Sequence, residues 1–152
     1  MFPSDLALCK GIREMPRAKI FIGSSSGNVG VAQLIANRLE DDCSADVQVW
    51  NEGIFRLNQG FLESLIDTLG EFDFAVLVWG DDDITQSKGE SQASPRDNVI
   101  FECGLFMGTL GRERVFIVHD RSKAIKIPSD FAGVTLTSMT VRASMAQMPM
   151  RQ

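Results

Sequence analysis

The sequence predicts an α/β protein built on a doubly wound parallel sheet of about five strands. Short apolar runs typical of buried strands alternate along the chain with segments that carry apolar residues at helical spacing. The run 74–79 has no polar alternation, as expected of a strand covered on both faces. Alternating strands and helices favour parallel pairing with right-handed crossovers. Ligands of such sheets bind beyond the carboxyl ends of the strands, beside a topological switch point.

The composition is that of one globular domain. Of the 152 residues, 44% are hydrophobic and 23% are charged, and the net charge of −5 argues against a nucleic-acid partner. No apolar run is long enough to span a bilayer, and the first residues lack a basic region followed by an apolar one. We therefore expect a cytoplasmic protein without a membrane partner. Three widely spaced cysteines (Cys9, Cys43, Cys103) predict neither a disulfide framework nor a zinc site.

The folded domain is expected to span residues 19–138. The segment 1–18 contains Pro3 and Pro16 and is interpreted as an N-terminal extension or linker. Residues 139–152 hold four of the seven methionines without a clear fold. They are interpreted as a C-terminal tail or a linker to a further domain.

The first half of the domain has the order strand, helix, strand, helix. A strand at 19–22 leads directly into a glycine and serine turn at 23–27, and a helix follows from about 28 to 42. Its apolar stripe is Val31, Leu34, Ile35 and Leu39. A second strand spans 46–50, and Asn58 opens a second helix. The stripe of that helix, at i, i+3, i+4 and i+7, is Leu62, Leu65, Ile66 and Leu69.

The second half continues this alternation after the strand at 74–79. A long polar connection without periodicity runs from Gly80 to Asp97, and connections of this size are usually functional or mobile. A helix then ends near Gly111, and strands are expected at 115–118 and near 134–136.

The helix that begins near Asp97 carries one carboxylate among apolar side chains. The neighbours of Glu102 at helical spacing are Phe101, Cys103, Leu105 and Phe106. A carboxylate in such surroundings loses hydration and is rarely buried without a partner, so it indicates a functional site. The alternatives are a position at the rim of the helix, or a bond to a backbone amide or to Arg96.

The turn after the first strand offers backbone amides and hydroxyl groups at a helix N-terminus. Free amides and the helix dipole favour a phosphate or pyrophosphate there, with Gly23, Ser24 and Ser25 as candidate ligands. In the alternative, one serine caps the helix, although a cap needs one small residue and all five are small. The turn also fits Gly-x-Ser-x-Gly, but the chain is short for an α/β-hydrolase. Only His119 could complete a triad, and it fits an ordinary solvated loop histidine better.

Two further features have weaker functional interpretations. The run Asp81–Asp83 follows the third strand and could hold magnesium, but acidic loops are more often solvated, so no metal is expected. Gly104 and Gly108 lie four residues apart on the Glu102 helix and would let another backbone approach closely. Because that helix is apolar nearly all round, this favours contact with a second subunit.

The turn and the third strand also suggest a flavin site. Residues 23–28 resemble the phosphate loop of short-chain flavodoxins, and Trp79 stands where a flavin-stacking aromatic would lie. A flavin site, however, leaves Glu102 without an explanation.

Three motifs in the second half resemble a known family. Residues 96–112 read Arg-x-Asn-Val-x-Phe-Glu-x-Gly-x-Phe-x-Gly-x-Leu-Gly-Arg, Arg114-Val115 follows, and residues 127–133 read Ile-Pro-Ser-Asp-Phe-x-Gly. These motifs are similar to those of TIR-like domains of bacterial antiphage effectors, which are fused to STING-like or cyclic-nucleotide-sensing domains in CBASS and Pycsar systems. The resemblance runs from about Lys19 to Leu136.

This resemblance implies a flavodoxin-like TIR fold that cleaves NAD⁺ at the nicotinamide–ribose bond. By position, Glu102 matches the catalytic glutamate of the family, and Arg96 and Asn98 match its surroundings. Ser24 and Ser25 lie on the first strand-to-helix loop of the family. Family members become active on assembly into oligomers or filaments when a sensor domain binds a cyclic nucleotide. Such a sensor would lie outside this chain, and NAD⁺ would be a substrate, with no cofactor.

The implied chemistry suits these residues. Breaking the bond between nicotinamide and ribose develops oxocarbenium character, which a fixed anion stabilises more in the transition state than in the ground state. Nicotinamide leaves as a neutral molecule and needs no general acid. Trp79 or Phe21 could stack on a ring of the substrate. The alternatives are a nucleoside deoxyribosyltransferase-like enzyme, an FMN-binding module, and a TIR scaffold that only assembles.

Overall fold

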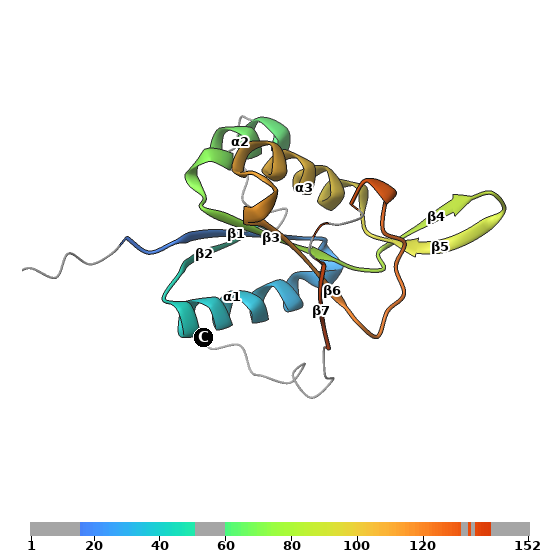
Figure 1. Ribbon diagram of the computed structural model, residues 1–152, viewed down its shortest axis with the longest axis horizontal. Helices are drawn as coiled ribbons and strands as arrows, with labels where there is room; N and C mark the ends of the chain where they lie inside the picture. Colours follow the sequence, from blue (N-terminus) through green and yellow to red (C-terminus); the bar gives the residue numbers. More distant parts are fainter. Residues whose placement is uncertain (1–15, 51–59, 132–133, 135, 141–152) are drawn as a thin grey trace, which may run out of the picture.

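The computed structural model describes residues 16–50, 60–131, 134 and 136–140 (Figure 1). Its main sheet has five parallel strands in the order β2-β1-β3-β6-β7. The strands are β1 (Lys19–Ser24), β2 (Asp46–Trp50), β3 (Phe74–Trp79), β6 (Val115–Asp120) and β7 (Leu136–Met139). The strand order reverses between β1 and β3, so the switch point lies there. The predicted doubly wound parallel sheet is confirmed.

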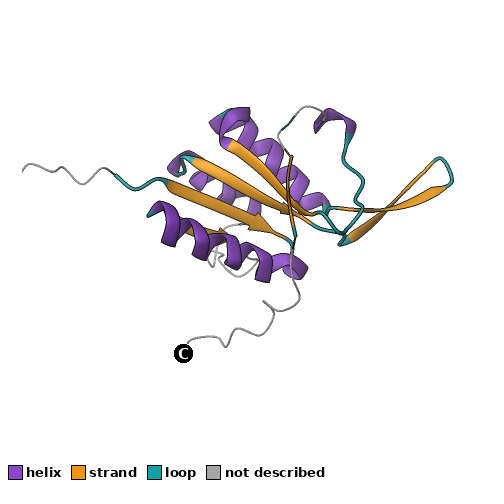
Figure 2. Ribbon diagram, turned by 60° about the horizontal axis from the view of Figure 1, so that its bottom comes forward, coloured by secondary structure: helices purple, strands orange, loops and turns teal. Residues whose placement is uncertain are grey.

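Helices cover both faces of this sheet. Helix α1 (Val29–Cys43) lies on one face, while α2 (Phe61–Thr68) and α3 (Asp97–Leu110) lie on the other (Figures 1 and 2). Short 3-10 turns complete the connections: η2 (Ser26–Asn28), η3 (Leu69–Glu71), η4 (Arg112–Arg114) and η5 (Ser129–Phe131). Among the described residues, no helix is long and apolar enough to cross a membrane.

Aromatic rings fill the core beneath α2 and α3. Phe21 on β1 is fully buried, with ring centroids 4.4 Å from Phe106, 5.4 Å from Phe72 and 5.7 Å from Trp50. The opposite face of the sheet is covered by α1, whose buried residues there are Ala32 and Ala36. Five of the six residues of β3 are buried, which confirms that this strand is covered on both faces.

The connection between β3 and α3 is more ordered than its sequence predicts. It contains an antiparallel hairpin of β4 (Asp83–Ser87) and β5 (Glu90–Ser94), which projects away from the main sheet (Figure 1). Lys88 and Gly89, with φ of 52° and 83°, form its two-residue turn. The prediction of an irregular connection is wrong. Polar side chains on both strands, and an exposed Ile84, leave no apolar alternation that would indicate strands.

Several element boundaries and stripes also differ from their predictions. Leu65 and Leu69 are buried as predicted, whereas Leu62 and Ile66 are 40% and 51% exposed. The last strand begins at Leu136, about two residues later than expected. Asn58, Cys9 and most of the two expected end segments lie outside the described residues, and the domain limits at 18 and 138 stay predictions.

We predict that the aromatic core dominates stability. Phe106→Ala should lower the free energy of unfolding by about 3–5 kcal/mol, because it removes a fully buried ring and leaves a cavity. Phe116→Ala is the matched control, because Phe116 is 36% exposed and contacts only the ring of Phe74 among the described aromatic pairs, so its loss should cost about 1–2 kcal/mol. Urea denaturation of both variants provides the measurement, and equal losses would contradict this account of the core.

Candidate active site

Glu102 lies at the carboxyl edge of the sheet. It is in the second turn of α3 and only 4% exposed, beside the buried residues Val99, Cys103 and Phe106 of the same helix. Its Oε2 atom is 2.9 Å from the position that a Cβ on Gly23 would occupy. Gly23 is the penultimate residue of β1, so the carboxylate lies over the end of the strand beside the switch point.

Gly23 permits this approach because it has no side chain. An added Cβ would also lie 2.8 Å from Leu77 Cδ1 and 2.9 Å from Phe21 Cε1, both in the core. The three surrounding atoms leave no room for a methyl group. The glycine of the turn therefore has a steric role that its sequence context alone does not show.

Three buried polar atoms lie at the same edge, on three neighbouring strands. Ser24 Oγ on β1, Trp79 Nε1 on β3 and His119 Nδ1 on β6 make no hydrogen bond within the described part of the chain. Trp79 pairs with His119 in the parallel register. Leaving such an atom unsatisfied costs about 1–3 kcal/mol, and polar groups of this kind are uncommon away from functional sites. By strand alternation, Trp79 and His119 lie on the face of the sheet that α3 covers, together with Glu102, whereas Ser24 lies on the face that α1 covers.

The burial of His119 differs from what its sequence context suggests. The sequence places it at the end of a strand as an ordinary solvated histidine, whereas in β6 it is half-buried. Because side chains alternate along a strand, His119 shares a face with Ile117, on the side of the sheet that α3 covers. The sequence feature that indicates a strand position for His119 is the apolar run that begins at Val115, which no glycine or proline interrupts before His119.

The serines of the turn have unequal surroundings. Ser25 is buried and its Oγ accepts a 3.0 Å hydrogen bond from Asn28 Nδ2. Ser25 is the N-cap of η2 and Asn28 the N-cap of α1, yet neither side chain makes a capping bond. Ser25 therefore does not cap a helix with its side chain, which was the alternative to ligand binding.

The aromatic residues suggested for stacking lie inside the protein. Phe21 is fully buried among other core rings, and Trp79 is 1% exposed. The Trp79 ring packs edge-on against Phe131, with centroids 5.1 Å apart and an interplanar angle of 78°. In this arrangement neither ring presents a face to a ligand, and Trp79 offers its indole N–H instead.

Arg96 and Asn98 lie at the start of the Glu102 helix. Arg96 is the N-cap of α3, and its Nε is 3.8 Å from Asp83 Oδ2, with both side chains about 40% exposed. Asn98 is exposed and one helical turn before Glu102, so it shares that side of α3. The structure therefore places Asn98 at the rim of the site and turns Arg96 toward the hairpin.

The three consecutive aspartates reach three different elements. Lys123 Nζ donates a 2.7 Å hydrogen bond to Asp81, Asn28 donates to Asp82, and Arg96 faces Asp83. The hydrogen bond from Lys123 lowers the pKa of Asp81. In the described part of the chain no cluster of three or more His, Cys, Asp or Glu side chains could hold a metal ion.

The Cys103 thiol lies beside Glu102 but has no direct part in the site. Burial raises the pKa of the Cys103 thiol to about 12, so this neighbour of Glu102 stays protonated and a poor nucleophile near pH 7.

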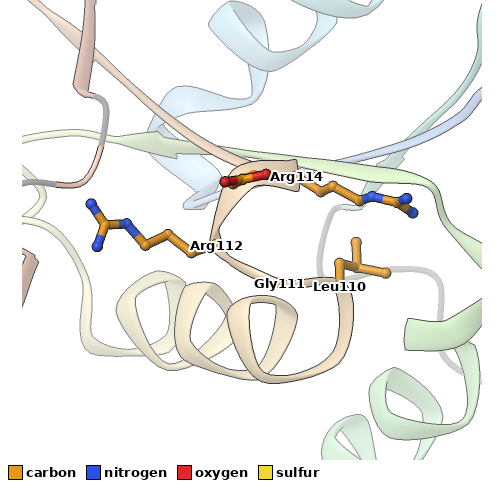
Figure 3. A pocket seen from close by; sticks show the side chains of 5 residues that line it. Leu110, Gly111, Arg112 and Arg114 are labelled. Carbon is orange, nitrogen blue, oxygen red and sulfur yellow. The ribbon is translucent and has the colours of Figure 1, made fainter.

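A hollow of about 590 Å³ lies between the end of α3 and the start of β6, lined by five consecutive residues, 110–114 (Figure 3). It adjoins the amino end of β6, away from the carboxyl edge, and its Arg112 and Arg114 point in opposite directions.

Comparison with known sequences shows the family of this chain. The family model described as CAP12/Pycsar effector protein, TIR domain, matches residues 19–141. The chain belongs to this family. This TIR domain is 40% identical over 119 residues to the Pycsar effector protein BcPycTIR of Burkholderia cepacia, covering 78% of this chain and 39% of the relative. The TIR fold expected from the motifs is thereby shown.

Two further relatives support the assignment. The Pycsar effector protein PaPycTIR of Pseudomonas aeruginosa is 41% identical over 130 residues, covering 86% of this chain and 42% of its own length. CD-NTase-associated protein 12 of a Lachnospiraceae bacterium is 42% identical over 123 residues, covering 80% of this chain and 37% of its own length. The TIR domain thus spans about two fifths of the curated relatives that it matches.

We predict that Gly23 cannot be replaced without disturbing Glu102. Gly23→Ala should lower the free energy of unfolding by about 1–3 kcal/mol, because the methyl group meets the carboxylate and two core atoms. Gly30→Ala is the control: an added Cβ there meets nothing within 4 Å in the exposed first turn of α1, and stability should rise by about 0.5–1 kcal/mol. Thermal unfolding measures both, and a neutral Gly23→Ala would contradict the packing described.

Proposed function

We propose that this TIR domain is an NAD⁺ glycohydrolase and the effector module of a cytoplasmic antiphage defence system. The observation that carries the proposal is the Glu102 carboxylate, buried beside Gly23 at the carboxyl edge of β1. Nucleotides bind doubly wound sheets at this position, beside the switch point. The CBASS and Pycsar context is supported by the family and by the names of the relatives.

In the proposed reaction, the bond between ribose C1′ and the nicotinamide nitrogen breaks, and a water oxygen forms the new bond to C1′. The products are nicotinamide, ADP-ribose and a proton. Positive charge develops on the ribose as the bond lengthens, and the Glu102 carboxylate would stabilise it in surroundings that exclude water. A carboxylate held by a packed helix needs no reorganisation during the reaction, which is why its burial favours catalysis.

The remaining candidate residues would bind the substrate. Gly23, at the end of β1, lies beside Glu102, and Ser24 and Ser25 follow it. We infer that these three residues contact NAD⁺ mainly through their backbone amides, because the Ser24 side chain shares the opposite face of the sheet with Ile22. Asn98, on the rim, and Arg96 would contact the parts of NAD⁺ that extend beyond the edge. NAD⁺ acts here as a substrate, and the proposal needs neither a metal nor a cofactor.

We further propose that self-association activates the enzyme and that a cyclic nucleotide is the signal. The matched part of each curated relative is 37–42% of its length, which leaves room for a sensor outside the TIR domain. Gly104 and Gly108 lie on the exposed side of α3 with nothing within 4 Å of an added Cβ, beside Phe101, which is 52% exposed. An open apolar helix face of this kind favours contact with a second copy.

The alternative functions differ in how well they suit the site. Burial of Trp79 removes the stacking face on which an FMN-binding module would depend. A deoxyribosyltransferase-like enzyme would use the same buried glutamate, so the bond cleaved is what separates it from a glycohydrolase. A scaffold that only assembles would release no nicotinamide.

We predict that Glu102 accounts for most of the catalysis. Concentrated wild-type protein should release nicotinamide from NAD⁺, and Glu102→Gln should lower the turnover number by about 10²–10³-fold, because it removes the charge at nearly constant volume. Glu40→Gln is the matched control, since Glu40 is exposed on α1 across the sheet and its loss should leave turnover unchanged. Chromatography of the products over a protein dilution series provides the measurement. Undiminished turnover by Glu102→Gln would contradict the proposal.

A further inference from the structure

Two loops at the carboxyl edge are joined by Asn28 and Asp82. Asn28 Nδ2 donates to both carboxylate oxygens of Asp82, at 3.2 Å and 3.0 Å, and to Ser25 Oγ at 3.0 Å. The partners are 54 residues apart, and the bonds are partly buried. This contact, which we call the Asn28–Asp82 clasp, ties the turn after β1 to the loop after β3.

Two glycines provide the space for the clasp. A Cβ on Gly80 would collide with Asn28 Nδ2 and lie 2.9 Å from Asp82 Oδ2. A Cβ on Gly27 would lie 2.8 Å from Asp82 Oδ1. Neither glycine has a positive φ, so neither is required for backbone conformation. The glycines of both loops are thus fitted to the clasp, which shows that it is part of the packing of this edge.

The clasp also places a negative charge at the start of α1. The positive end of a helix dipole and its free amides attract an anion, and the sequence suggested a ligand phosphate there. In the structure the Asp82 carboxylate lies against Gly27 and Asn28, the last two residues before α1. A phosphate approaching this end of the turn would meet a like charge.

The neighbours of Asp82 anchor the same loop less firmly. Asp81 pairs with Lys123 after β6, and Asp83 faces Arg96 at the N-cap of α3. All four of these side chains are about 40% exposed or more, and pairs this exposed contribute little. The clasp is therefore the contact on which the position of the turn depends.

We propose that Asp82 is a positioning residue of the active site. It holds the Gly23–Ser25 turn in register with Glu102, and its charge keeps phosphate groups away from the N-terminus of α1. The turn then faces the uncharged ribose of the substrate, and the diphosphate lies elsewhere. This inference rests on the proposed function for its consequences in catalysis, and it replaces the phosphate-binding role expected for the turn.

Three variants and one control test the clasp. Asp82→Ala removes it, Gly80→Ala displaces Asn28 without changing either partner, and the double variant Asn28→Asp with Asp82→Asn rebuilds the bond with donor and acceptor exchanged. Asp81→Ala is the control, because it breaks only the exposed pair with Lys123. We expect amide hydrogen exchange in residues 23–31 to quicken about tenfold in the first two variants and to return close to wild type in the exchanged pair.

Kinetics and ligand binding distinguish a positioning role of Asp82 from a purely structural one, because a purely structural role would leave both unchanged. We expect Asp82→Ala to raise KM for NAD⁺ by about tenfold with kcat changed by less than about threefold, and the exchanged pair to recover KM. Inorganic pyrophosphate, measured by calorimetry, should bind Asp82→Ala more tightly than wild type.

The proposal is overturned by unchanged hydrogen exchange in Asp82→Ala, by an exchanged pair that does not recover, or by pyrophosphate binding that weakens. Absence of nicotinamide release from wild type at every concentration would instead refute the proposed function. Hydrogen exchange and pyrophosphate binding would still decide whether the clasp fixes the turn and excludes phosphate.

Discussion

The approach of the Glu102 carboxylate to the backbone of Gly23 constrains the whole carboxyl edge of this TIR domain. A carboxylate is costly to remove from water, so its position must be fixed by packing that is stable without it. Here that packing is the aromatic core under α3, in which Phe21 and Phe106 lie directly below the site. Gly23 then decides how close the charge can come to the strand end. The contact between Gly23 on β1 and Glu102 on α3 therefore matters both for the stability of the fold and for the proposed chemistry.

Much of the fold could be predicted because its strands are continuous and apolar. β2 and β3 have the bounds expected from their sequences, and helix α3 ends just before Gly111 as anticipated. The β4–β5 hairpin could not be predicted in the same way, because its side chains are mostly polar and exposed, so no apolar alternation indicates strands. Likewise Leu62 and Ile66 match a buried stripe but are exposed, since helical spacing shows that a face is apolar without showing what covers it.

The site was predictable in its central residue and less so in its surroundings. Glu102 was identifiable as a lone charge in an apolar helix, and Gly23 as part of a turn. The role of Asp82 was not, because its contact with Asn28 depends on the parallel pairing of β1 and β3, which brings together residues far apart in the chain. Trp79 likewise packs against Phe131, which lies beyond the hairpin, α3 and β6 in the chain. The sequence pattern of a single helix or strand cannot predict contacts of this kind, because they join residues from different elements.

The most direct measurement is a crystal structure of the Glu102→Gln variant with NAD⁺ bound, since this substitution keeps the shape of the side chain and is expected to slow the proposed turnover. Our account predicts that the ribose C1′ of the nicotinamide half lies within roughly 3–4 Å of the substituted amide side chain, beside Gly23. NAD⁺ bound instead in the hollow formed by residues 110–114, or a side chain at position 102 turned out to solvent, would contradict it.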